Sequence, residues 1–147
     1  MARKQPFGSL QTLARGHETR WQRNLSAKLK TLQVEEQRLD QLTRFAEEYG
    51  ANATEAPSSQ SIMAVRGRRQ FVDRLRDAVG QQRKAVAVQQ AAADRDLAKW
   101  QQARAQRLAL DRYADRQLDA EARKRERSAQ RQLDEVGNRT FLRRRDP

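Results

Sequence analysis

Carboxylates and one histidine are the side chains of this chain that could support catalysis or bind a metal. Glutamates form adjacent pairs at Glu35-Glu36 and Glu47-Glu48, and His17 is the one histidine of the 147 residues. Neighbouring positions on a helix point to different faces, and the sequence has no cysteine to complete a zinc site. No phosphate-binding loop or His-Glu-x2-His motif occurs. We therefore expect no enzymatic activity, no cofactor and no small-molecule substrate.

Basic side chains could bind phosphate or carboxylate groups. The chain has 31 lysines and arginines against 19 acidic residues, a net charge of +12. Acidic residues are interleaved with most of them, as in Asp94-Arg-Asp96, which is typical of a solvated helix. Three consecutive basic residues occur only at 123–125 and 143–145. No recognisable module that binds nucleic-acid bases by hydrogen bonding or stacking accompanies them. An acidic protein or an anionic membrane face is therefore expected ahead of nucleic acid.

Two apolar ladders with seven-residue steps dominate the rest of the sequence. The first ladder is Leu25, Leu32, Leu39 and Ala46, and the second is Val72, Val79, Val86, Ala93 and Trp100. Such a repeat makes a helix supercoil around a partner helix. The stretch 50–61 between the ladders contains Gly50, Asn52, Pro57 and three serines, residue types that favour turns. The pattern predicts an all-α protein, an antiparallel coiled-coil hairpin of two long helices.

Capping and helix-breaking residues predict where these helices begin and end. Ser9 is a suitable N-cap, Gly50 a suitable C-cap, and Gly137 a later stop signal. We expect one elongated domain with a helix over 9–49, a loop over 50–62, a longer helix over 63–136 and a basic tail over 137–147. Folding the chain about residue 60 places position n opposite about 120 minus n. Residues beyond about Arg112 would then have no partner within the chain.

Two phenylalanines flank the expected seam near the hairpin turn. With the ladders at heptad position a, Phe45 and Phe71 both occupy position g, and g positions share one edge of an antiparallel pair. An exposed aromatic pair rimmed by Arg38, Arg74 and Glu48 would be a protein-binding patch. Alternatively, both rings fold over the seam and cover its alanines. The pattern alone leaves both interpretations open.

Residues along nearly the whole chain resemble the FliJ family, the small coiled-coil component of flagellar type III export. The matching residues are Leu10-x2-Leu13, Val34-Glu-Glu-Gln37, Leu42-x2-Phe45-x2-Glu-Tyr49, Arg69-Gln-Phe71-Val-x2-Leu75-x2-Ala78-Val, Leu97-Ala-Lys-Trp100-x6-Arg107-Leu and Asp115-Arg-Gln117. Members of this family look like the rotor stalk of rotary ATP synthases. The resemblance implies a stalk that promotes ring assembly of the export ATPase hexamer and contacts the membrane export gate and export chaperones.

No membrane-spanning stretch or signal peptide is expected from the sequence. The resemblance implies a cytoplasmic protein, peripherally associated with the inner face of the cell membrane at the flagellar base. A generic coiled-coil scaffold, a type III chaperone adaptor and a basic nucleic-acid-binding coil are the alternatives.

The resemblance also implies two sets of binding residues. The family's gate-binding pattern falls on Arg38, Leu42, Phe45, Tyr49, Phe71, Leu75, Ala78 and Gln82. Two departures from that pattern change the polar rim: Arg38 stands where the family has Gln, and Gln82 where it has His. Phe45 in place of Tyr removes only a hydroxyl group. On the stalk hypothesis the ATPase-facing residues are Leu10, Leu13, Leu118, Arg123, Arg125, Arg127 and Arg131. Alternatively, the last quarter of the chain is a frayed basic tail in the free protein that becomes ordered on binding.

Overall fold

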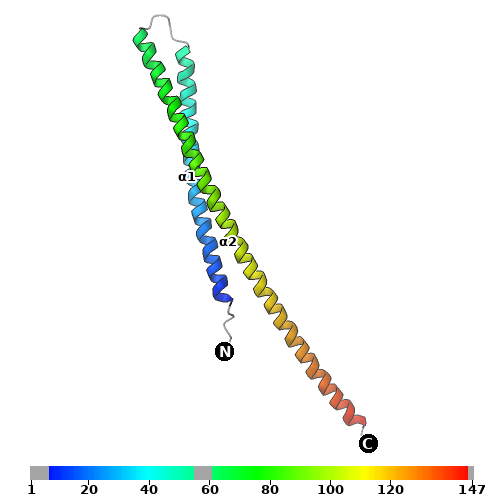
Figure 1. The fold of residues 1–147 in the computed structure, drawn as a ribbon. Coiled ribbons are helices and arrows are strands. Elements are labelled where there is room, and N and C mark those ends of the chain that lie inside the picture. The colour runs from blue at the N-terminus through cyan, green and yellow to red at the C-terminus, as the bar shows by residue number, and fades with distance from the viewer. Residues whose placement is uncertain (1–6, 55–60, 146–147) are drawn as a thin grey trace. The chain divides into compact units, whose positions relative to one another are not determined.

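Two long α-helices make up the described part of the chain, which covers residues 7–54 and 61–145 of a computed structural model. Helix α1 spans Gly8–Thr54 and helix α2 spans Ile62–Arg145, with 47 and 84 residues (Figure 1). No strand occurs in these two ranges. The all-α prediction with a longer second helix is therefore confirmed.

Both helices extend beyond their expected ends. Helix α1 continues through Gly50 to Thr54, and α2 continues through Gly137 to Arg145. The end at 136 and a separate basic tail from 137 are therefore wrong for the described residues. A glycine ends a helix when it adopts the left-handed conformation, and no glycine in the described ranges has a positive φ. A glycine with helical φ and ψ weakens a helix by about 1 kcal/mol relative to alanine but does not end it.

Residues 55–60, the centre of the expected loop, lie outside the described residues. Helix α2 begins at Ile62, one residue before the expected start. Ser61 precedes it, and its Oγ atom accepts a hydrogen bond from the Ala64 amide at 3.3 Å. Ser61 is therefore the N-cap of α2. The expectation of a single domain stays a prediction, because the chain divides into two compact units, 17–103 and a second unit that holds 7–16 and 104–145.

A heptad seam holds the two helices together within residues 17–103. All nine ladder residues are buried or partly buried. The most enclosed side chains of this unit are Leu32, Val72, Val79, Ala93 and Ala103. Most positions between the ladder steps, including Leu42, Leu75 and Gln89, are also at least partly buried. Apolar burial at a and d positions of both helices stabilises the pair, as in a coiled coil.

Side-chain contacts fix the register of this unit. The rings of Tyr49 and Phe71 meet edge to face at 5.1 Å between centroids. Farther along, the Lys99 ammonium lies 4.6 Å from the centroid of the Trp21 ring. Both pairs obey the expected register, in which position n lies opposite about 120 minus n.

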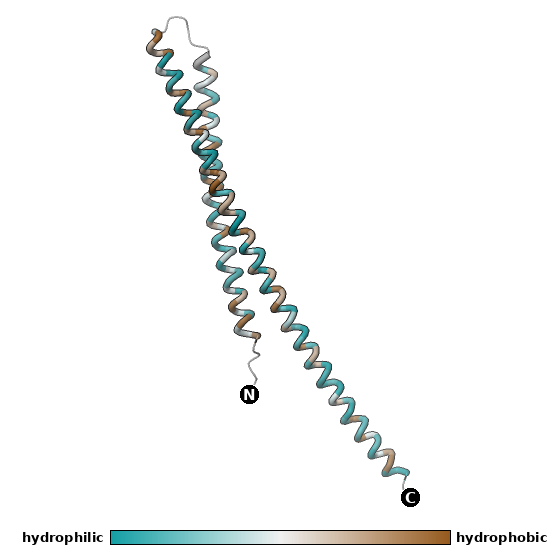
Figure 2. The backbone as a smooth tube through the Cα atoms, viewed as in Figure 1, coloured by the Kyte–Doolittle hydropathy of each residue, from teal (hydrophilic) through white to brown (hydrophobic). Residues whose placement is uncertain are grey.

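The other compact unit pairs the first turns of α1 with the middle of α2. Phe7 and Tyr113 meet edge to face at 4.9 Å, and Ala14 and Ala114 are buried. Pairing therefore extends slightly beyond Arg112, the expected limit. Every residue from 115 to 145 is exposed, and hydrophilic residues dominate this part of α2 (Figure 2). We call residues 115–145 the exposed segment.

Candidate protein-binding surfaces

Three aromatic residues form an exposed edge near the hairpin end of the seam. Phe45, Tyr49 and Phe71 retain 51%, 47% and 46% of their accessible surface. The Tyr49 and Phe71 rings are inclined at 79°, a T-shaped arrangement that favours aromatic pairs. We call these three residues the aromatic edge. The phenylalanine rings are thus about half exposed rather than folded away over the seam, and Tyr49, which the heptad pattern places in the seam, is exposed with them.

A hollow of about 540 Å³ adjoins the aromatic edge. Its lining includes the Tyr49 and Phe71 rings, the buried Val72, and Gly67, where an added Cβ would meet no atom within 4 Å. The remaining lining residues are Asn52, Ala64 and Arg68. An apolar hollow with two aromatic walls can receive a side chain from another protein.

The predicted gate-binding residues all lie in the 17–103 unit, but they differ in exposure. Leu42, Leu75, Ala78 and Gln82 are partly buried in or beside the seam, whereas Arg38, Phe45, Tyr49 and Phe71 are exposed. The four partly buried residues therefore stabilise the helix pair on which the four exposed residues lie. The exposed group is the part that a partner can reach.

Glu35 is a residue of this surface that sequence reasoning missed. Its carboxylate pairs with the Arg38 guanidinium at 3.2 Å. Across the seam, the Gln82 Nε2 group donates to the Glu35 carboxylate and, at 3.0 Å, to the Glu35 backbone carbonyl. Arg38 and Gln82, the two polar departures from the family pattern, thus share one partner. Glu35 occupies heptad position d, where a carboxylate is unusual. This unusual position is the sequence feature that could have identified the residue.

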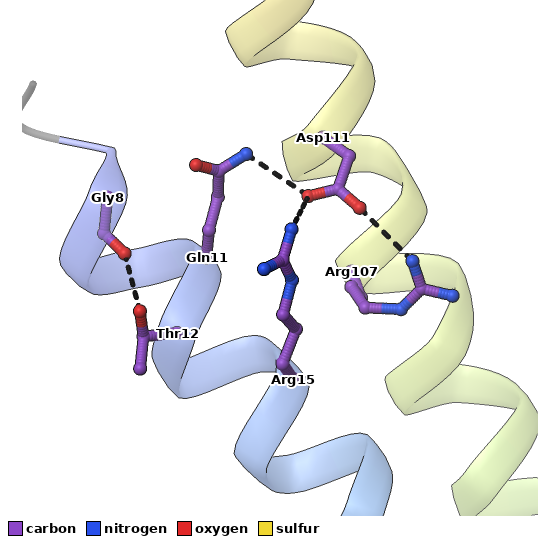
Figure 3. A network of polar contacts seen from close by, with 6 residues as sticks. All are labelled: Gly8, Gln11, Thr12, Arg15, Arg107 and Asp111. Atoms are coloured by element: carbon purple, nitrogen blue, oxygen red, sulfur yellow. Dashed lines mark hydrogen bonds and ion pairs between the residues drawn. The ribbon is translucent and has the colours of Figure 1, made fainter.

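A second polar cluster joins the start of α1 to α2 (Figure 3). The Oδ1 atom of Asp111 accepts a hydrogen bond from Gln11 Nε2 at 3.1 Å and pairs with Arg15 at 3.8 Å. Its Oδ2 atom accepts a hydrogen bond from Arg107 at 3.1 Å. One carboxylate therefore holds donors from both helices. Sequence reasoning missed this cluster because its members are far apart along the chain.

The residues expected to face an ATPase lie in the unit that contains 7–16 and 104–145. Leu10 and Leu13 are exposed on the first turns of α1, and Leu118 is exposed on α2. The four arginines of this set are exposed on α2, within the exposed segment: Arg123, Arg125, Arg127 and Arg131. These residues offer separate apolar side chains and positive charge to a partner.

Neither a candidate metal site nor a membrane span appears in the described ranges. Residues 7–54 and 61–145 contain no group of three or more His, Cys, Asp or Glu residues that could hold a metal ion. None of the helical segments there combines the length and apolar character that crossing a bilayer requires. The described residues form a helical protein, and its exposed surfaces are candidates for binding other proteins.

The family comparison agrees with the resemblance. The model of the family described as "Flagellar FliJ protein" matches residues 3–146, nearly the whole chain. The chain belongs to the FliJ family and is a flagellar export-related protein. This is a family of non-enzymatic flagellar components. No curated protein and no solved structure matches the chain.

Proposed function

We propose that this chain is the stalk of a flagellar type III export apparatus. In this role it promotes assembly of the export ATPase hexamer and links the ATPase, the membrane export gate and the export chaperones. It acts on the inner face of the cell membrane as a peripheral component. Membership of the FliJ family supports the setting, and the exposed aromatic edge is the observation that carries the proposal.

The aromatic edge is the proposed gate-binding surface. Interface hot spots are commonly aromatic side chains that fill a partner's pocket. Phe45 and Phe71 are about half exposed, so their rings can lose further surface when a partner binds. Arg38, paired with Glu35, adds a polar rim at one end. This combination of an apolar centre and a polar rim is the usual anatomy of a protein interface.

Removal of both phenylalanine rings tests this assignment. Phe45→Ala combined with Phe71→Ala should weaken binding to the purified cytoplasmic domain of the export gate by at least about tenfold, the loss expected when a hot-spot residue is truncated. Leu29→Ala combined with Val88→Ala is the matched control, because both side chains are exposed on the same unit away from the aromatic edge. Circular dichroism should show equal helicity for both variants. Unchanged gate binding by the phenylalanine variant would contradict the proposal.

The unit with the two chain ends is the proposed ATPase-binding part. Its exposed leucines and the arginines from Arg123 to Arg131 can contact apolar and acidic groups inside a ring. Arginine–carboxylate pairs are stronger where water is partly excluded. The gate and the ATPase would therefore contact different residues of one chain.

A further inference from the structure

Three arginines of α2 form a row with seven-residue steps. Arg69, Arg76 and Arg83 each lie four residues after a seam position, and all three are exposed. Seven residues of α-helix span about 10 Å, so their side chains project along the same face at that spacing. In heptad terms they occupy position e, whereas Phe45 and Phe71 occupy g. The arginine row, as we call these three residues, therefore borders the opposite edge of the same seam.

No member of the arginine row has an ion pair with another described residue. Flanking positions of a coiled coil usually pair with an opposite charge on the facing helix. On α1 the corresponding e positions are Gly50, Thr43 and Glu36. Glu36, opposite Arg83, is the one charged residue of the three, and the two have no ion pair in the described ranges. The helix pair therefore leaves these guanidinium groups available to a partner.

A hollow of about 500 Å³ lies beside Arg76 and Arg83. Ala46 and Val79 belong to its lining, as do Gly50 and Gly80. A Cβ added at either glycine would meet no atom within 4 Å, so the space is open. The hollow is also lined by Thr43 and Glu47, and Glu47 has no ion pair with the arginines among the described residues.

We propose that the arginine row and this hollow bind an acidic α-helix of a partner protein, with carboxylates spaced seven residues apart. Carboxylates at that spacing would match the step of about 10 Å between arginines, and each guanidinium can hold a carboxylate through two hydrogen bonds. The glycines allow a third helix to approach closely. Charge alone would suit any polyanion, but the hollow favours a helix. This surface is separate from the aromatic edge, and the proposal does not depend on the proposed export function.

Binding of a synthetic helical peptide tests the charge match. The probe is a labelled three-heptad peptide with glutamate at one position of each heptad, and its comparison peptide has glutamine there. The protein should bind the glutamate peptide, and Arg69→Gln, Arg76→Gln and Arg83→Gln together should weaken binding by at least about tenfold, as expected for losing charge-assisted contacts. A control variant with Arg20→Gln, Arg112→Gln and Arg116→Gln removes the same charge from other exposed positions and should bind nearly as wild type.

Gly80→Leu tests whether the hollow takes part. Leucine would fill the space, whereas Gly80→Ala adds a single methyl group and leaves most of it open. The leucine variant should lose peptide affinity and the alanine variant should keep it, with helicity checked by circular dichroism. Equal affinity for the glutamate and glutamine peptides would overturn the proposal. An equal loss of peptide affinity in the arginine-row variant and the control variant would also overturn it. Full affinity of Gly80→Leu, or tighter binding of duplex DNA than of the peptide, would also overturn it.

Discussion

The side-chain amide of Gln82 donates hydrogen bonds across the seam to both the backbone carbonyl and the carboxylate of Glu35. The same carboxylate holds Arg38 at the end of the proposed gate-binding surface. A family pattern with Gln in place of Arg38 and His in place of Gln82 would present other groups to Glu35. The two departures therefore belong to one polar cluster, and its carboxylate connects the seam to the surface.

Replacing Glu35 should affect stability according to which contact is lost. Glu35→Ala removes an acceptor from the partly buried Gln82 and should lower the free energy of unfolding by about 1 kcal/mol. Glu35→Gln keeps an acceptor and should cost less. Arg38→Ala should change stability little, because its side chain is 61% exposed. Urea unfolding of the three variants measures this order, and equal stability of Glu35→Ala and wild type would contradict it.

Loss of the Asp111 carboxylate should loosen the start of α1. Asp111→Ala removes the group that Gln11, Arg15 and Arg107 share. Hydrogen exchange at the amides of residues 8–16 should accelerate, because opening there no longer breaks these contacts. Exchange near Leu32 should change much less. Asp115→Ala, at a nearby exposed position, is the control, and equal acceleration in both variants would show that the cluster does not hold α1.

Truncation of the chain before Arg123 should abolish its effect on the export ATPase without unfolding the helix pair. All residues from 123 to 145 are exposed, so their removal should shift the melting temperature by no more than about 2 °C, as for a change that removes little burial. Under the proposed function the truncated chain should lose stimulation of export ATPase assembly but still bind the gate. An ATPase assay with equal stimulation by the full and truncated chains would place the ATPase contact elsewhere.

Two glycines of α2 should respond differently to alanine. Gly80 lies in the paired part of the helix and has room for a methyl group, so Gly80→Ala should raise stability by about 1 kcal/mol. Gly137 lies in the exposed segment, where helix formation contributes little to the packed seam. Gly137→Ala should therefore leave the main unfolding transition unchanged. Thermal unfolding followed by circular dichroism tests both expectations, and a similar rise in both variants would show that the exposed segment unfolds together with the seam.

The seam and its register could be predicted from the sequence because they depend on repeated apolar spacing. Leu32 and Val79 are buried where the heptads place them, and Tyr49 meets Phe71 in the expected register. The exposure of Tyr49 could not be predicted from spacing, since it depends on the hollow beside Gly67 at the end of the pair. The helix ends were missed because Gly137 is also compatible with helical φ and ψ.

The polar clusters of the candidate surfaces could not be predicted from the heptad pattern, for a different reason. Heptad positions describe which face a residue occupies, but a hydrogen bond depends on one rotamer at one level of the pair. Gln11 and Asp111 are 100 residues apart, and their bond exists only because the register is correct to within one turn. For Phe45 and Phe71, the g positions left exposure and folding over the seam as open alternatives, and the structure shows both side chains about half exposed.

The exposed segment has a kinetic consequence. With no burial to add, its helix depends on backbone hydrogen bonds and local pairs such as Gln130 with Asp134, and isolated helices of this kind open readily in water. Trypsin cleaves after arginine and lysine and needs an opened backbone, so cleavage should begin in this arginine-rich stretch while the seam is still closed. A partner that holds the segment would suppress those early cuts. The rate of proteolysis in the exposed segment would then measure the fraction of this segment that is bound by a partner, without any label on the protein.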